Sequence, residues 1–295
     1  MARPSIRRLD VAAGSADRDL PEIQARPSLQ LGAKLVFGAF RDRMLVGLLA
    51  VSADGAFATV AASDHFVATD VDADLVYGEL YREAAQTCLE AGAHIHDVEV
   101  LASSPAETAF FNLGFGRRTC IATRGVAFAD SVPGPVVIRA ATAADLDTIA
   151  ALSALEGSHR TQSPILADHG PITADSARSY HERLLDAAAT HLIAELGGEA
   201  VGLITIEWTN AFGGLLEPTM PLIGSTFVSA DHRGHGIAAA LLNAAMERLA
   251  ARGHPIVSVT FNTTNLLSRS FWSGLGFAPV GWKLARRIPQ RYVHK

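Results

Sequence analysis

The residues from Val228 to Ala238 combine an arginine, two glycines and the start of a predicted helix. A short apolar stretch typical of a β-strand ends at Val228, and Arg233-Gly234-His235-Gly236 follows after a polar turn. Two glycines let the backbone curl so that successive N–H groups point to one spot. The helix that opens at Ile237 has no acidic residue in its first turn, so its N-terminus adds partial positive charge. This chemistry suits a phosphate or pyrophosphate group.

A second polar motif follows downstream, in Asn265-x-x-Ser268-x-x-x-Trp272-x-x-Leu275-Gly276-Phe277. The spacing predicts a helix over 265–274 and a tight turn at Gly276. Asn265 and Ser268 offer hydrogen-bonding side chains. Trp272 is more typical of a hydrophobic core, and its indole cannot act as a proton-donating acid.

Length and composition limit the classes of protein to consider. A chain of 295 residues with 49% apolar and 19% charged residues can bury the cores of two domains. The net charge of −5 argues against nucleic acid as a general partner and suits a cationic or amine substrate. The two cysteines, Cys88 and Cys120, have no metal-binding spacing. We find no signal peptide or apolar run that would span a bilayer and expect a soluble cytoplasmic protein without a membrane partner.

The elements that position these motifs alternate between strand and helix patterns, which predicts an α/β protein. In the first half, the patterns predict a strand over 57–68, a helix over 75–91 and a strand over 98–101. In the second half, they predict helices over 143–155 and 173–189, joined by a polar loop over 156–171. A hairpin and the strand before the glycine loop follow.

The two halves of the sequence repeat each other. Phe66-Val67 matches Phe227-Val228 at an offset of 161, and Gly92 matches Gly253 at the same offset. Leu113-Gly114-Phe115 matches Leu275-Gly276-Phe277 at an offset of 162. We therefore predict two copies of one α/β domain, over 1–130 and 136–295, with a linker at 131–135.

The copies differ where the phosphate chemistry would lie. The segment Arg233-Gly234-His235-Gly236-Ile237-Ala238 corresponds to Asp72-Ala73-Asp74-Leu75-Val76-Tyr77 in the first copy. An anion replaces the arginine, a second anion is added, and both glycines are lost. A pyrophosphate would be repelled there, so we predict that only the second copy binds one.

Both motifs, in this order, resemble those of the GCN5-related N-acetyltransferase (GNAT) superfamily. The resemblance covers essentially all of 136–295 and, in degraded form, about 30–130. It implies two tandem GNAT-type domains, each with a mixed, largely antiparallel sheet flanked by helices. Tandem proteins with one degenerate copy occur in this superfamily.

The resemblance implies acetyl-CoA as the cofactor and direct attack of an amine on its thioester. The strand before the loop would separate from its neighbour, pantetheine would lie in the gap, and the Val228 N–H would polarise the thioester carbonyl. Backbone N–H groups from Gly234 to Ala238 would hold the pyrophosphate. The full predicted cofactor-binding set is Phe227, Val228, Arg233, Gly234, His235, Gly236, Ile237, Ala238, Asn265 and Ser268.

The sequence leaves more than one candidate for the residues that transfer protons. The family often has a tyrosine at the position of Trp272, so Ser268 is a nearby candidate for protonating the thiolate. Glu207 and Glu217 are candidate bases, although each is also typical of a solvated strand edge or loop.

The polar loop over 156–171 would cover the acceptor site in this family. Glu156, His159, Asp168 and His169 are its candidate substrate contacts, and a polar surface loop would have the same composition. Their irregular spacing is poor for a metal site, so we predict none.

The leading hypothesis is an N-acetyltransferase that acts on a small-molecule amine such as an amino sugar, amino acid derivative or secondary metabolite. The protein would be a monomer or homodimer. Two alternatives remain: a non-catalytic CoA-binding sensor or scaffold, which the absent tyrosine favours, and a protein or peptide N-acetyltransferase.

Overall fold

The computed structural model describes residues 4–9, 34–128, 135–167, 172–208, 212, 215–289 and 292. The chain divides into two compact units, neither of which is one continuous stretch of sequence. Unit 1 comprises Met1–Thr119, Phe212–Glu217 and Val280–Lys295, and unit 2 comprises Cys120–Ala211 and Pro218–Pro279.

The sheet of unit 1 is mixed and largely antiparallel. Its strands run in the order β1-β2-β3-β4-β6-β13, and β5 pairs with β3 away from this path. Among the strand pairs of its described residues, β4 with β6 is parallel and the others are antiparallel. The strands are β1 (Ser5–Arg8), β2 (Leu35–Arg41), β3 (Met44–Asp54), β4 (Phe57–Val60), β5 (His65–Val67), β6 (Ile95–Leu101) and β13 (Ala278–Arg287).

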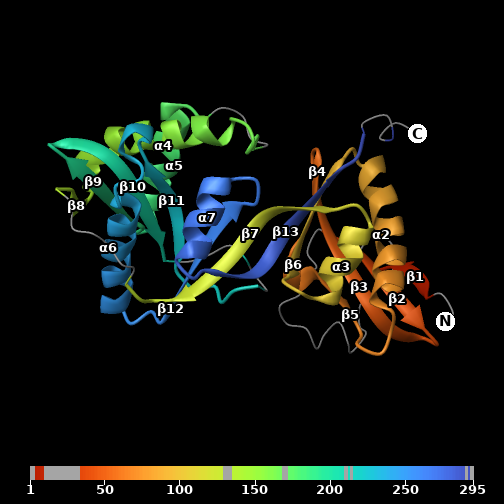
Figure 1. Ribbon diagram of the computed structural model, residues 1–295. Helices are drawn as coiled ribbons and strands as arrows, with labels where there is room; N and C mark the ends of the chain where they lie inside the picture. Colours follow the sequence, from red (N-terminus) through yellow and green to blue (C-terminus); the bar gives the residue numbers. More distant parts are fainter. Residues whose placement is uncertain are drawn as a thin grey trace. The chain divides into compact units, whose positions relative to one another are not determined.

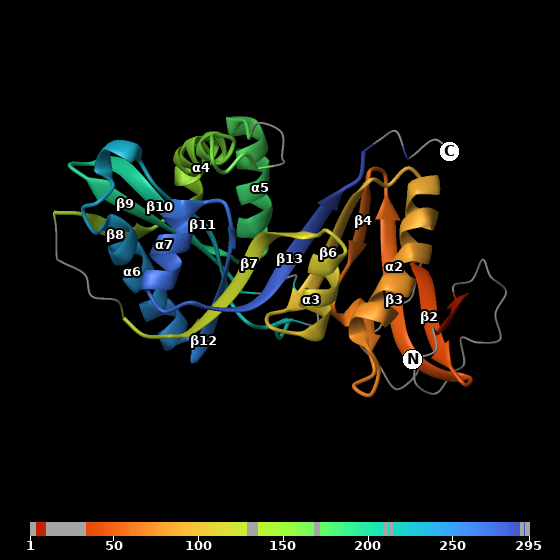
Figure 2. The same ribbon diagram turned by 45° about the vertical axis from the view of Figure 1, so that its right-hand side comes forward.

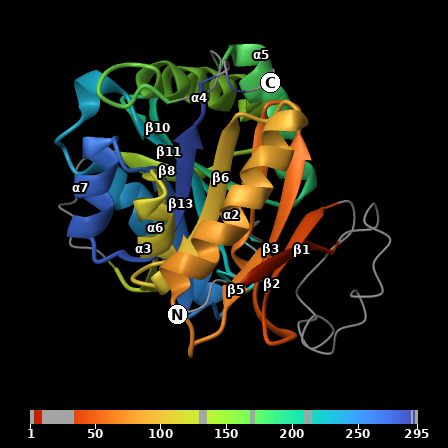
Figure 3. The ribbon, with the colours of Figure 1, turned by 90° about the vertical axis from the view of Figure 1, so that its right-hand side faces the viewer.

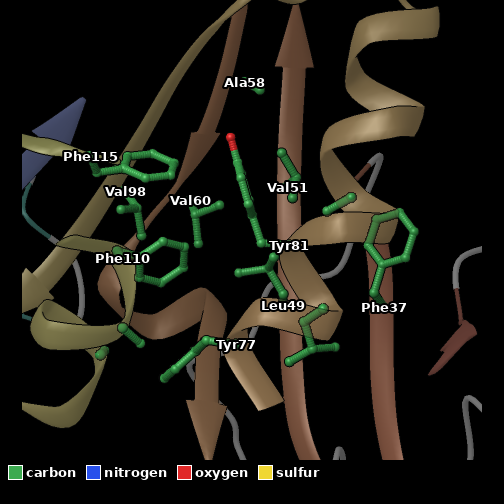
Figure 4. Packing of buried hydrophobic residues seen from close by; sticks show 14 of the residues in the cluster. Phe37, Leu49, Val51, Ala58, Val60, Tyr77, Tyr81, Val98, Phe110 and Phe115 are labelled. Atoms are coloured by element: carbon green, nitrogen blue, oxygen red, sulfur yellow. The ribbon is translucent and has the colours of Figure 1, made fainter. Parts of the chain in front are cut away.

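Two helices of unit 1 have well-formed N-caps. Asp72 caps α2 (Ala73–Glu90) by accepting from the Leu75 N–H, and Ser104 caps α3 (Pro105–Asn112) in the same way. Figure 3 shows α2 crossing the face of the sheet. Aromatic side chains fill the space beneath, and Tyr77, Tyr81, Phe110 and Phe115 lie together in Figure 4.

The sheet of unit 2 is also mixed, with strands in the order β12-β11-β10-β9-β8. Successive pairs are antiparallel except β11 with β12. The strands are β8 (Val137–Ala140), β9 (Thr190–Leu196), β10 (Glu199–Glu207), β11 (Leu222–Val228) and β12 (Ile256–Asn262). Next to β12 lies β7 (Gly116–Gly125), whose residues from Cys120 onward belong to unit 2.

The helices of unit 2 are α4 (Leu146–Arg160), α5 (Ala174–Asp186), α6 (Ile237–Ala251) and α7 (Leu266–Gly274). Ile149 and Leu152 of α4 pack on Leu203, whereas Leu241 of α6 approaches Gly202. Because neighbouring strand residues point to opposite faces, α4 and α6 cover opposite faces of the sheet. Figures 1 and 2 show α4 beside α5 at this sheet.

The sequence repeat recurs in the backbone. Gly92 and Gly253 end the helices α2 and α6 at φ values of 90° and 73°, and Gly114 and Gly276 follow α3 and α7 at 86° and 82°. Glycine is the residue that adopts this left-handed conformation without strain. The two copies therefore share their helix-ending turns as well as their order of elements.

The compact units differ from the contiguous domains expected at 1–130 and 136–295. Unit 1 includes the last strand, because β13 pairs with β6 over Gly281–Arg287. Unit 2 includes the end of β7, and the Val126 N–H donates to the Pro255 carbonyl at 2.9 Å. Each sheet is thus completed by a strand from the other half of the sequence. Residues 131–134 of the expected linker lie outside the described residues.

Two local predictions were wrong. The strand expected over 57–68 is two strands, β4 and β5, separated by a 3₁₀ turn at Ala62–Asp64. The helix expected to end at Leu155 continues to Arg160, so Glu156 and His159 lie on a helix rather than in a loop. Gly157 lies inside this helix and does not end it. Its lack of a side chain lets Ile172 pack closely against the helix, because a Cβ at Gly157 would lie 2.5 Å from the Ile172 Cβ.

Candidate active site

A gap opens between the parallel strands β11 and β12. The paired residues are Leu222 with Ser258 and Ile223 with Val259. Both strands continue beyond these pairs, to Val228 and Asn262. The strands therefore separate toward the glycine loop, as the family resemblance implies.

The peptide of Val228 faces this gap. Ser229 donates its N–H to the Val201 carbonyl on β10 at 2.9 Å, and Val228 is opposite Gly202. In an antiparallel pair, N–H groups of successive residues point alternately toward and away from the partner strand. The Val228 N–H accordingly points away from β10, toward the space between β11 and β12.

The glycine loop has the predicted left-handed geometry. Gly234 and Gly236 have φ values of 80° and 79°, and Gly236 is the N-cap of α6. A Cβ at either glycine would meet no protein atom within 4 Å. The glycines are thus required by backbone conformation, and they leave the N-terminus of α6 open to an anion.

Arg233 ties the loop to the strand before it. Its Nε donates to the Val228 carbonyl at 3.0 Å, and its guanidinium lies 5.6 Å from the centre of the Phe227 ring. The arginine therefore fixes the peptide that follows Val228 while its charge stays at the loop. This structural role was not apparent from the sequence.

The loop, the gap and α7 enclose a cavity of about 370 Å³. Most of the predicted cofactor-binding residues line it, whereas His235 has an exposed side chain and does not. The lining residues are Glu156, His159, Arg160, Thr226, Phe227, Val228, His232, Arg233, Gly234, Gly236, Ile237, Ala238, Ala239, Asn265, Leu267, Ser268, Phe271 and Trp272.

The α7 motif contributes to both structure and cavity wall. Asn265 is the N-cap of α7, and its side-chain oxygen accepts from the Ser268 N–H at 3.1 Å. Both residues line the cavity. Trp272 is buried, with 3% of its surface exposed, and packs edge-on against Phe277. Trp272 is a core residue, as predicted, and Phe277 is buried beside it.

Glu156 brings a carboxylate to the cavity from α4. Its side chain is 21% exposed, and Arg160 lies one helical turn away at 4.0 Å. Burial raises the pKa of this carboxyl, while the charge of Arg160 and a hydrogen bond with Ser225 oppose the rise. Burial lowers the pKa of the neighbouring His159, and the charge of Arg233 lowers it further.

Glu207, at the end of β10, has a different environment. Tyr180 of α5 donates its hydroxyl to Glu207 Oε1 at 3.2 Å. Burial raises the pKa of Glu207, against the effect of this hydrogen bond. Burial, followed by the Glu207 charge, raises the pKa of Tyr180 to about 12, so the phenol remains a donor at neutral pH.

The other predicted site residues are not brought to the cavity. Glu217 belongs to unit 1 and does not line it. Asp168 and His169 lie outside the described residues. In the described part of the chain, no three His, Cys, Asp or Glu side chains form a group that could hold a metal ion.

Several residues that surround the site were missed from the sequence. His232 lines the cavity, and its buried Nδ1 has no hydrogen-bond partner within the described ranges. Gly224, Thr205 and Tyr180 surround Glu207. Only Gly224 carried a sequence signal, since a glycine inside a strand pattern marks a bulge or a close approach.

Comparison with known proteins matches part of the chain to a family. Residues 157–277 match the Acetyltransferase (GNAT) family. These residues form a GNAT-family domain. The domain is that of an acyltransferase, and the matched residues include the gap, the loop and α7. Comparison with curated proteins gives no significant match.

Solved structures share the GNAT fold over most of the chain. A GCN5-related N-acetyltransferase from Sphaerobacter thermophilus has a TM-score of 0.62 and 16% identity, covering 97% of this chain and 95% of that chain. A tandem GNAT protein from the clavulanic acid biosynthesis pathway has a TM-score of 0.54 and 16% identity, covering 87% and 83%. The chain thus shares the fold of these structures, one of which is a tandem GNAT protein.

A third similar structure is part of a larger protein. It contains a GCN5-related glucosamine N-acetyltransferase region of a fungal multi-domain GH3 β-N-acetylglucosaminidase. The TM-score is 0.56 at 12% identity, covering 97% of this chain and 38% of that chain. In the described part of this chain, no helix is long and apolar enough to cross a membrane.

Proposed function

We propose that this protein transfers the acetyl group of acetyl-CoA to the amine of a small molecule, using the cavity of unit 2. The observation that carries this proposal is the coincidence of three features in one cavity. They are the opening between β11 and β12, the Val228 N–H directed into it and the glycine loop at the N-terminus of α6.

The residues of the cavity have complementary roles in this proposal. The N–H groups from Gly234 to Ala238 hold the pyrophosphate, and Arg233 holds the loop in place while adding positive charge. Asn265 and Ser268 face the pantetheine arm. The Val228 N–H donates to the thioester oxygen, where negative charge develops during attack.

The base lies among the carboxylates on the acceptor side. Glu156 lines the cavity, and Glu207 is connected to it through β11. Glu217 does not line the cavity, so it is the weaker candidate for the base. None of the described residues that line the cavity is a tyrosine, so Ser268 or water protonates the departing thiolate in this proposal.

Thermal unfolding with acetyl-CoA tests cofactor binding. At 100 times its Kd, acetyl-CoA should stabilise the protein by about 2.7 kcal/mol. Gly236→Glu should abolish this stabilisation, because the carboxylate enters the phosphate site and strains the left-handed backbone. Gly198→Glu is the matched control: Gly198 also has a positive φ, of 87°, but does not line the cavity.

Unchanged acetyl-CoA binding by Gly236→Glu would refute the site assignment. Release of CoA thiol, measured with an amine panel, then tests catalysis. If acetyl-CoA binds and no amine or peptide releases CoA, the non-catalytic sensor becomes the better hypothesis. If only peptides release CoA, the acceptor is a protein rather than a small molecule.

A further inference from the structure

Three successive residues of β11 connect the CoA cavity to both candidate carboxylates. Thr226 lines the cavity, Ser225 hydrogen-bonds with Glu156, and Gly224 contacts Glu207. The register between β10 and β11 shifts at this point, between Ile204 and Ile206. Such a bulge changes the direction of side chains, and here it places both carboxylates along one short segment.

The position of Glu207 is fixed on two sides. Tyr180 donates to Glu207 Oε1 at 3.2 Å from α5. A Cβ at Gly224 would lie 2.4 Å from the same oxygen and 2.5 Å from the Thr205 hydroxyl, so a larger residue there would displace the Glu207 carboxylate from this position. Thr205 is fully buried, and its hydroxyl, which faces this spot, has no partner among the described residues.

The two carboxylates differ in how their charge is balanced. Glu156 has Arg160 at 4.0 Å. Among the described residues, the hydrogen-bond partner of Glu207 is the neutral phenol of Tyr180, and no cation pairs with it. A partly buried carboxylate without a cation favours a positively charged ligand. It disfavours a ligand that places a second negative charge beside it.

We propose that Glu207, held by Tyr180 and Gly224, binds the acceptor's ammonium group, and that the acceptor is a compact amine without a carboxylate beside its amino group. Glu156, in the cavity wall, then receives the proton that the ammonium must lose. This inference rests on the function proposed above and narrows its acceptor class: amines of the amino sugar or arylalkylamine kind fit, and free α-amino acids do not.

The reaction balances with the groups named. The ammonium loses one proton to Glu156, and the nitrogen lone pair forms a bond to the thioester carbon. The C–S bond breaks, and its electron pair leaves on the CoA sulfur, which takes up a proton. The nitrogen loses its second proton, so the products are the amide, CoA thiol and one proton released to solvent.

Matched pairs of amines test the charge requirement. The probes are tyramine with tyrosine, histamine with histidine, and phenethylamine with phenylalanine, with glucosamine as a further amine. In each pair only the α-carboxylate differs. We expect kcat/KM, measured by CoA thiol release, to favour the amine by about 30-fold or more.

Three variants separate the roles of the carboxylates. Glu207→Gln should raise the KM of the accepted amine by about 10-fold and reduce the preference for amine over amino acid. Gly224→Ala should reproduce this effect by displacing Glu207. Glu156→Gln should lower kcat with little change in KM. Glu199→Gln, on the exposed end of the same strand, should have no effect.

The outcomes distinguish this inference from the function on which it rests. If acetyl-CoA does not stabilise the wild-type protein against thermal unfolding, the proposed function itself is refuted. If acetyl-CoA binds but none of the four amines releases CoA, the acceptor class is wrong. Equal use of amines and amino acids, or a Glu207→Gln enzyme with unchanged KM and preference, would overturn the role of Glu207.

Discussion

The two units contain the same strand arrangement at corresponding positions but fill it differently. In unit 2, β11 and β12 separate and leave a cavity of about 370 Å³. In unit 1, β4 pairs with β6 and the chain then turns, so that β5 pairs with β3. A cavity in the core of unit 1 has a volume of only about 20 Å³.

Side chains occupy the corresponding space in unit 1. His65 corresponds to Thr226, and Tyr77 to Ala238, at the offset of 161. His65 Nε2 donates to the Glu99 carbonyl at 2.9 Å, and the Tyr77 hydroxyl donates to His65 Nδ1 at 2.8 Å. Phe110, which corresponds to Trp272, packs on both rings. We call His65, Tyr77 and Phe110 the aromatic plug.

The former loop of unit 1 is also used for structure. Asp72 caps α2, and Asp74 accepts from the Asn112 side chain at 2.8 Å. Unit 1 therefore differs from unit 2 by more than the two glycines: it has bulky rings at these positions, and its carboxylates cap α2 and hydrogen-bond with Asn112.

Transfer of the plug to unit 2 should have the largest effect on function. Ala238→Tyr copies Tyr77 and should fill the cavity, weakening acetyl-CoA binding by about 1,000-fold or more, which equals about 4 kcal/mol. Isothermal titration with acetyl-CoA measures the loss. Leu267, which lines the cavity but is 58% exposed, gives the control Leu267→Ala with a much smaller effect. Unchanged affinity of Ala238→Tyr would show that CoA binds elsewhere.

Removal of the plug from unit 1 should instead affect stability. Tyr77 is 4% exposed, so Tyr77→Ala should lower the free energy of unfolding by about 3 kcal/mol through lost packing and the unpaired His65. Urea unfolding measures this change. Tyr77→Phe, which keeps the ring, should lose only about 1 kcal/mol. If Tyr77→Ala created a second acetyl-CoA site, the plug alone would account for the difference between the units.

How far the sequence predicts this structure depends on the range of the interactions. The Gly234–Gly236 loop, the α7 motif and the repeat were predictable because glycine conformation and helix capping leave local patterns. The exchange of β7 and β13 was not, because strand pairing between distant segments leaves no local pattern. Gly157 was misleading, because a glycine that permits close packing with Ile172 looks the same as one that ends a helix.

The acceptor side was only partly predictable for the same reason. Glu207 was one of several plausible carboxylates, since nothing in its neighbours announces the hydrogen bond from Tyr180, 27 residues away. The side chains that fix its position come from α5, β10 and β11, which meet only in the folded chain. Sequence patterns identified the cofactor loop because its chemistry is carried by consecutive backbone groups.

The units differ further in their buried histidines, which gives a prediction about acid stability. In unit 2, His181 is fully buried between Ser153 Oγ, 2.6 Å from Nε2, and His191 Nε2, 2.9 Å from Nδ1. Burial and, to a smaller extent, the charge of His191 lower the pKa of His181 to about 4. In unit 1, His96 instead bonds with the neutral Tyr81 hydroxyl at 2.8 Å.

Because the unfolded chain binds a proton at His181 near pH 6.5 and the folded chain only near pH 4, stability falls as the pH decreases through this window. We expect the free energy of unfolding to be about 2 kcal/mol lower at pH 5 than at pH 7 on account of His181. Urea unfolding from pH 4 to pH 7 measures this slope. His181→Gln should make the curve flatter, whereas the exposed His235→Gln should leave it unchanged. An unchanged slope in His181→Gln would assign the acid sensitivity to other buried groups, and unit 2 would then lose its distinction from unit 1.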